Sequence, residues 1–174
     1  IVWPVESGSR LYLTGMGSSW FAADTAARRM RRAGVHAVAD LASTEVGYPP
    51  DPSLTVIGIS ASGGSKETVE FLAGHHGVSR TIALTNTPEA TMPADVTVQM
   101  LAKPEPGGVA CRSYVHTLIL LLQLEHQLAG TVPDLAAKVR QAADAVDTLL
   151  ASRADWVPAV HHAPASASAT RPWP

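Results

Sequence analysis

The chain has 174 residues, which is the length of one compact domain with a short tail. Hydrophobic residues make up 46% of it and charged residues 16%, so the chain is not disordered and can bury a real core. Its formal net charge of −2 argues against partners such as nucleic acid or an anionic membrane surface, because both select basic patches.

The single cysteine, Cys111, permits no internal disulfide, which is typical of a reducing compartment. We interpret it as a small apolar residue of a loop or of the core, with a nucleophile as the alternative. The longest apolar run, residues 117–122, is much shorter than the roughly 20 residues of a membrane span, and no signal peptide is recognisable. We therefore expect a cytoplasmic protein. Because the chain opens with Ile1 rather than Met, we expect a fragment or a processed product.

Short apolar runs alternate with helix-forming stretches along most of the chain. Such runs, bounded by glycine, proline and polar clusters, predict strands at residues 10–14, 35–39, 54–60, 80–85 and 95–100. Helix-forming composition predicts helices at residues 20–33, 66–73 and 112–128, and another after Pro133. This alternation predicts an α/β fold, a three-layer sandwich with a five-stranded parallel sheet flanked by helices.

Two features concern the second half of the chain. The helix at residues 112–128 is apolar almost all round between Val115 and Leu122, which predicts burial. The next helix carries one apolar stripe, suited to packing on the sheet or on a partner, and we expect a homodimer: Leu135, Val139, Ala142, Val146 and Leu149. The pattern then fades, so we predict a single domain over residues 1–153 and a disordered tail, or a truncated linker to a second domain, over residues 154–174.

Clusters of glycine and serine follow two of the predicted strands, at Gly15–Ser19 and Ser60–Ser65. Each lies between a strand and a helix, where free backbone N–H groups and the helix dipole favour an anion. Glycine lets the backbone approach closely, and serine hydroxyls donate hydrogen bonds without bulk. Serines and backbone amides can thus surround a phosphate without a basic side chain, with Lys66 expected in solvent. The alternative is that these are only turn and cap residues.

Other known nucleotide-binding and catalytic loop motifs are incomplete or absent in this sequence. A dinucleotide fingerprint begins at Gly15 and Gly17, but Trp20 occupies the position of its third glycine. The Walker spacing is absent at Gly63–Lys66, and no Gly-x-Ser-x-Gly nucleophile elbow occurs. No dinucleotide or nucleoside triphosphate site is therefore indicated.

Histidines and one glutamate are the remaining candidates for a functional role. Adjacent histidines on a helix point in different directions, so His75-His76 and His161-His162 are poor metal sites, and we expect solvated or capping roles. We interpret His116 as a satisfied core histidine. Glu105 is a candidate to accept a proton or to bond a sugar hydroxyl, and a solvated loop carboxylate is the equal alternative. We expect no metal and no cofactor.

Four segments between residues 10 and 130 carry a family resemblance: Gly17-Ser18-Ser19 after an apolar strand, Ala42-Ser43-Thr44-Glu45, Ile59–Ser65, and Glu105 through Val109-Ala110. Their order and spacing resemble the sugar isomerase (SIS) family of phosphosugar-binding domains. Within that family the likeness is nearest to the first isomerase half of the glutamine–fructose-6-phosphate aminotransferases. The serine loop at residues 59–65 is the most specific of the four segments.

The resemblance implies a set of substrate-binding residues, of which the serines contact the phosphate: Ser18, Ser19, Ser60, Ala61, Ser62, Ser65, Val109 and Ala110. Four positions depart from the family pattern, with Ala61 for Gln, Gly64 for Glu, and Cys111 and Arg112 for Ser and Thr. The family's acid/base glutamate, ring-opening histidine and closing lysine belong to segments without a match here, so the catalytic residues stay unassigned.

The resemblance implies a partner in the form of a sugar phosphate or an amino-sugar phosphate. The chain would be the first half of a tandem protein resembling an isomerase, an aminotransferase or a deaminase. A non-catalytic sugar-phosphate sensor or regulatory module is the alternative. A third reading is a structural remnant whose apolar helices only need a partner.

Overall fold

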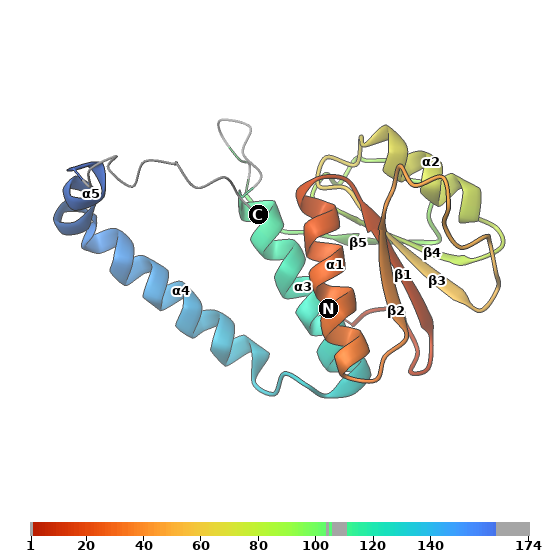
Figure 1. The fold of residues 1–174 in the computed structure, drawn as a ribbon, viewed down its shortest axis with the longest axis horizontal. Coiled ribbons are helices and arrows are strands. Elements are labelled where there is room, and N and C mark those ends of the chain that lie inside the picture. Colours follow the sequence, from red (N-terminus) through yellow and green to blue (C-terminus); the bar gives the residue numbers. More distant parts are fainter. Residues whose placement is uncertain (1, 104, 106–110, 163–174) are drawn as a thin grey trace, which may run out of the picture. The chain divides into compact units, whose positions relative to one another are not determined.

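The structure is a computed structural model that describes residues 2–103, 105 and 111–162 (Figure 1). The chain divides into two compact units, one ending at Pro133 and the other beginning at Asp134, and each is described by itself. Within the described residues, no helix combines the length and the apolar character needed to cross a membrane.

The first unit is built on one five-stranded sheet in which every pair of neighbouring strands is parallel. The strands are β1 (Arg10–Gly15), β2 (Ala37–Leu41), β3 (Leu54–Ile59), β4 (Arg80–Thr85) and β5 (Val96–Gln99). Their order in the sheet is β2-β1-β3-β4-β5, so the chain reverses its direction of travel across the sheet between β1 and β3. This confirms the predicted α/β class and its five parallel strands.

Helices cover both faces of this sheet (Figure 1). Helices α1 (Ser18–Arg32) and α3 (Cys111–Ala129) lie side by side on one face, and α2 (Lys66–His75) lies on the other. Strand β3 is buried along its whole length because its side chains alternate between the two cores. Ile57 and Ile59 belong to the core under α1 and α3, whereas Leu54 and Val56 belong to the core under α2.

Two predicted elements, one helix and one strand, shift by a few residues. Helix α1 begins at Ser18 rather than at residue 20, directly after Gly17, whose φ of 52° is readily adopted by glycine. Strand β2 begins at Ala37 rather than at residue 35. The backbone N–H of Val35 donates to the carbonyl of Met30 at 2.9 Å, so this residue still closes the end of α1.

The prediction of a fully buried α3 is wrong for one face of the helix. Its buried residues form a single stripe that packs on α1 and the sheet, while Val115 on another face is 53% exposed. The helix also buries a carboxylate, since Glu125 is only 3% exposed. Glu125 accepts hydrogen bonds from Arg29 of α1 at 2.7 and 3.1 Å and from Thr131 at 2.7 Å, which ties the two helices together.

Three single-residue predictions also need correction or detail. His75 is buried rather than solvated, because it stacks on Phe71 and bonds the hydroxyl of Ser79 at 3.1 Å. Cys111 is exposed at the start of α3 rather than part of a core. His116 is half-buried, and its Nδ1 accepts a hydrogen bond from the backbone N–H of Leu101 at 3.0 Å.

The second unit contains α4 (Leu135–Ala151) and α5 (Arg153–His162). Helix α5 forms where the sequence analysis expected a disordered tail or a linker. Its formation has a local cause, since Asp155 lies in its first turn and the indole of Trp156 donates to the carbonyl of Leu149 at 2.9 Å. The rest of the expected tail, residues 163–174, lies outside the described residues.

Candidate functional site

The carboxyl ends of β1 and β3 meet at one edge of the sheet, where the strand order reverses. In the parallel register Gly15 pairs with Ile59, the last residues of these two strands. Gly15 permits the close approach of α1, because a Cβ there would come within 2.8 Å of both the carbonyl oxygen of Ile59 and the Cβ of Ser19. The serine-bearing loops are thereby brought against each other, at the position where open α/β sheets bind ligands.

The loop after β3, residues 60–65, turns tightly back toward its own beginning. The backbone N–H of Gly63 donates to the carbonyl of Ser60 at 3.0 Å, and the N–H of Ser65 donates to the Ser60 hydroxyl at 3.4 Å. Gly63 has a φ of 68°, a conformation that favours glycine, and a Cβ there would collide with Ala90. The loop is therefore wound around Ser60, which is itself buried at 4% exposure.

The end of β4 holds the same loop from the other side. The carbonyl of Ala61 accepts three hydrogen bonds, from the backbone N–H of Asn86 at 3.0 Å and from the hydroxyls of Thr85 and Thr87 at 3.3 Å. The backbone N–H of Ser60 donates to the carbonyl of Leu84 at 3.0 Å. These bonds position the serines before any ligand arrives, which lowers the entropy cost of binding.

Two of the loop hydroxyls make only local bonds near the surface. The Ser62 hydroxyl accepts from the N–H of Gly64 at 3.2 Å. The Ser65 hydroxyl accepts from Thr68 at 3.0 Å and donates to the carboxylate of Glu67 at 3.2 Å. Each hydroxyl can exchange such a bond for one to a ligand oxygen by rotating about a single torsion.

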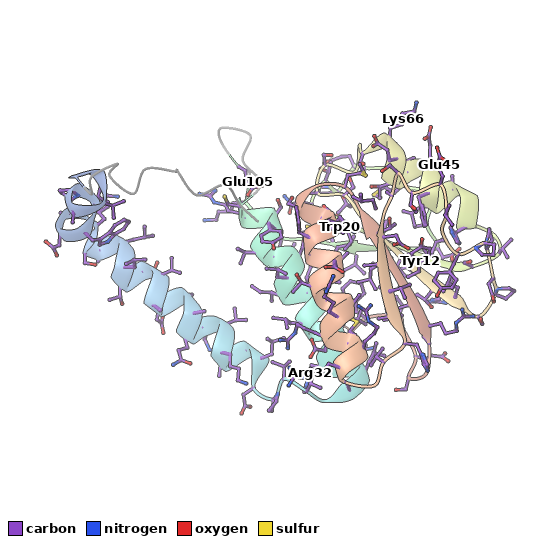
Figure 2. The ribbon with its side chains drawn as sticks, in the orientation of Figure 1. Tyr12, Trp20, Arg32, Glu45, Lys66 and Glu105 are labelled. Carbon is purple, nitrogen blue, oxygen red and sulfur yellow. The ribbon has the colours of Figure 1, made fainter. Side chains whose placement is uncertain are left out.

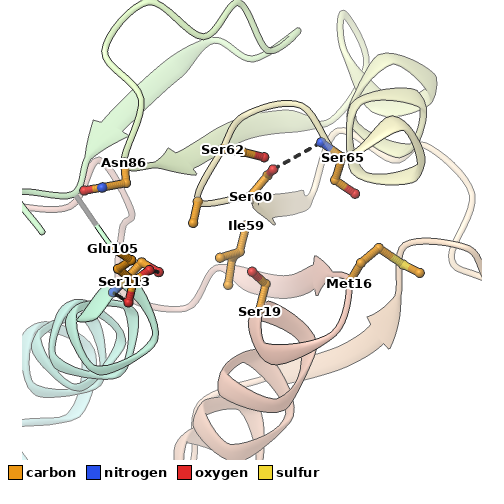
Figure 3. Close-up of a pocket in the computed structure, with 10 residues that line it drawn as sticks. Met16, Ser19, Ile59, Ser60, Ser62, Ser65, Asn86, Glu105 and Ser113 are labelled. Atoms are coloured by element: carbon orange, nitrogen blue, oxygen red, sulfur yellow. Dashed lines mark hydrogen bonds between the residues drawn. The ribbon is translucent and has the colours of Figure 1, made fainter. Parts of the chain in front are cut away.

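These residues line a pocket of about 430 Å³, a size suited to a small polar molecule (Figure 3). Its lining combines the ends of β1 and β3 with one residue after β4, one before α3 and one in α3: Met16, Ser19, Ile59, Ser60, Ala61, Ser62, Ser65, Asn86, Glu105 and Ser113. The structure thus brings together five of the predicted residues. Ser18 is not among those that line the pocket, and Val109 and Ala110 lie outside the described residues.

Sequence reasoning missed four of the lining residues, Met16, Ile59, Asn86 and Ser113. Asn86 had a usable signal, because it follows β4 directly, as the serine loop follows the neighbouring strand β3. Its side chain bonds both backbone groups of Ala102, accepting from the N–H at 3.0 Å and donating to the carbonyl at 3.1 Å. Asn86 therefore fixes the backbone of Ala102, three residues before Glu105.

Glu105 lies beside the start of α3 (Figure 2). Its Oε2 accepts from the Ser113 hydroxyl at 2.7 Å, and its Oε1 accepts from the backbone N–H groups of Ser113, at 3.3 Å, and of Arg112. Desolvation acts to raise the pKa of this carboxyl, but the Ser113 hydroxyl and these two N–H groups outweigh it and lower the pKa below its usual value. Glu105 is accordingly a charged helix cap at neutral pH, not a solvated loop carboxylate.

None of the ten lining residues that the structure describes carries a basic side chain. Lys66 begins α2 next to the serine loop, but its side chain is 83% exposed and lies 3.8 Å from the carboxylate of Glu70. Within the described residues, no group of three or more potential metal ligands comes together. Attraction of an anion here thus depends on hydroxyls, backbone N–H groups and the amino ends of α1 and α2.

The open parallel sheet and the pocket at its switch point define an α/β domain with a candidate ligand site. The family model of the SIS domain matches residues 6–126. The chain therefore belongs to the SIS domain family, which confirms the resemblance drawn from the sequence. No curated protein matches the chain.

Solved structures share the fold at low sequence identity. One is a protein from E. coli CFT073 in complex with a sugar phosphate, with a TM-score of 0.63 and 17% identity, covering 75% of this chain and 77% of that one. Another is the C-terminal domain of glucosamine-fructose-6-phosphate aminotransferase from Francisella tularensis, with a TM-score of 0.61 and 16% identity. The second match covers 85% of this chain but only 45% of that one.

Proposed function

We propose that this chain binds the phosphate group of a sugar phosphate or an amino-sugar phosphate in the pocket between β1 and β3. The observation that carries the proposal is the convergence of Ser19, Ser60, Ser62 and Ser65 around one cavity at the switch point of the sheet. Membership of the SIS domain family and the fold shared with the E. coli sugar-phosphate complex support the same ligand class.

The physical chemistry of the pocket suits a phosphate ester. Its oxygens accept several hydrogen bonds at once, and the serine loop offers hydroxyl donors next to the amino end of α2. A hydrogen bond to a charged group is stronger than one between neutral groups, so a few such donors suffice without a lysine or arginine. The loop at residues 60–65 also leaves room for the phosphate, because all of its side chains are small.

We further propose that this unit serves as the first half of a tandem SIS protein of the isomerase, aminotransferase or deaminase kind. The match to less than half of the aminotransferase domain chain supports this arrangement. A non-catalytic sugar-phosphate sensor stays the alternative. A homodimer and a cytoplasmic location stay predictions; the exposed Val146 and Leu149 of α4 support the former.

Isothermal titration calorimetry with a hexose 6-phosphate tests the phosphate site. The double variant Ser60→Ala, Ser62→Ala should weaken binding by about 3 kcal/mol, on the basis of about 1.5 kcal/mol for each hydrogen bond to a charged group. Ser9→Ala is the matched control, since Ser9 precedes β1 at the opposite end of the strands. Unchanged affinity in the double variant refutes the proposal. Turnover of fructose 6-phosphate or glucosamine 6-phosphate by the purified chain eliminates the sensor alternative.

A further inference from the structure

The pocket has two chemically different sides. In Figure 3, Glu105 and Ser113 lie across the cavity from Ser65, which precedes α2. The serine side offers hydroxyls and the amino end of a helix, which favour negative charge. The opposite side presents Glu105, the one charged side chain among the described residues that line the cavity.

The carboxylate of Glu105 retains capacity for a ligand. A carboxylate offers about four acceptor positions, two on each oxygen. Oε1 already accepts two backbone N–H groups from α3, whereas Oε2 accepts only the hydroxyl of Ser113 among the hydrogen bonds of the described residues. Toward the part of the chain that the structure describes, Oε2 therefore has one acceptor position left. Two hydrogen bonds between Asn86 and Ala102 fix the backbone three residues before Glu105, and the bonds of Glu105 to α3 fix the carboxylate itself.

The charge balance decides which donor fits that position best. A phosphate dianion and Glu105 together place about three negative charges at a pocket whose lining, as far as the structure describes it, has no lysine, arginine or histidine. The charge of Arg112 also lowers the pKa of Glu105, but Arg112 is exposed and outside the lining, so water screens it. A sugar hydroxyl satisfies the free acceptor position without adding positive charge. A protonated amine satisfies it and also supplies a positive charge, which makes the hydrogen bond to the carboxylate stronger than one between neutral groups.

We propose that Glu105 makes the pocket selective for amino-sugar phosphates over the matching hydroxyl sugars, by accepting a hydrogen bond from the protonated amine of the sugar. The inference rests on the proposed phosphate site and adds a specificity-determining residue to it. Glu105 then has two roles, since the same carboxylate caps α3 and recognises the ligand.

The test compares two ligands that differ only in an amine and a hydroxyl at one carbon. Glucosamine 6-phosphate and glucose 6-phosphate are titrated calorimetrically at neutral pH into the full chain and into Glu105→Gln. The glutamine retains a carbonyl oxygen for the N–H groups of α3 but loses the charge. The melting temperature and helix content of the variant show whether the cap survives. Glu89→Gln is the matched control, because Glu89 is exposed and lies outside the pocket lining.

The unchanged chain and Glu89→Gln should bind the amino sugar about five- to tenfold more tightly than glucose 6-phosphate, the gain expected from a charged over a neutral hydrogen bond. In Glu105→Gln this preference should disappear, mainly through weaker binding of the amino sugar. Equal affinities in the unchanged chain, or an equal loss for both ligands in Glu105→Gln, overturn the inference but leave the phosphate site standing. Failure of both ligands to bind the unchanged chain refutes the proposed function itself.

Discussion

Gly15 is a position at which two backbone elements leave no room for a side chain. A Cβ there would lie 2.8 Å from the carbonyl oxygen of Ile59 and 2.8 Å from the Cβ of Ser19. One of these atoms belongs to the backbone of the central strand β3, and the other is attached directly to the backbone of α1. Neither can move without shifting a whole element, so Gly15→Ala must push α1 away from β3.

Overpacking of this kind costs about 1–3 kcal/mol of unfolding free energy. Gly74→Ala provides a control of opposite sign, because a Cβ at this position of α2 meets nothing within 4 Å. Alanine should stabilise the helix there by up to about 1 kcal/mol. Urea unfolding followed by circular dichroism measures both variants against the unchanged chain. The pocket supplies a second readout, since displaced α1 carries Ser19 with it and hexose 6-phosphate binding should weaken.

The two readouts separate the steric argument from a general loss of stability. If Gly15→Ala unfolds at the same urea concentration as the unchanged chain, the inference that α1 packs too close to β3 for a side chain at Gly15 is wrong. If Gly15→Ala is destabilised but binds the ligand with full affinity, the steric clash is real and the placement of Ser19 in the phosphate site fails.

Three further predictions concern charge and association. Burial lowers the pKa of His75 below its ordinary value of 6.5, so the unfolded chain takes up a proton on this side chain at a higher pH than the folded chain does. The free energy of unfolding should therefore fall as the pH drops below about 6.5. His75→Gln should flatten this part of the curve of unfolding free energy against pH. Glu125→Gln should cost about 1.5–3 kcal/mol because it weakens the buried contact with Arg29. Asp24→Asn, at an exposed pair, should cost less than about 1 kcal/mol in the same urea assay. Leu149→Glu should convert the predicted dimer to a monomer in light scattering, and a surviving dimer excludes this face of α4 from the interface.

The fold class was predictable because the strands of this chain are short and strongly marked. Residues 54–59 are apolar almost throughout, as expected of a strand covered on both faces, and the structure buries all of them. Burial of helices was less predictable. The apolar run in α3 does not show which face meets α1, and helix α5 forms through contacts such as that of Trp156 with Leu149, which composition alone does not reveal.

Residues of the pocket were predictable where a local pattern marks them. Serines that follow a strand stand out in the sequence, and Ser60, Ser62 and Ser65 line the cavity. Ser113 has no such pattern, because it enters the pocket only through the packing of α3 beside the sheet. Glu105 was singled out as a proton acceptor, a sugar ligand or a solvated carboxylate, and only its bonds to α3 reveal the helix-capping role.

The register of the sheet explains why two loops so far apart in sequence form one site. Strands β1 and β3 are not consecutive, and their pairing places Gly15 opposite Ile59, so Ser19 and Ser60 follow the same edge although 41 positions separate them. A slip of one residue would reverse the two faces of β3 and turn Ile57 and Ile59 away from the core under α1 and α3. Because burial in two cores forbids that slip, the same apolar contacts that stabilise the sheet also fix the serines relative to each other. Binding at this pocket and stability of the central strands should therefore weaken together in variants of β3.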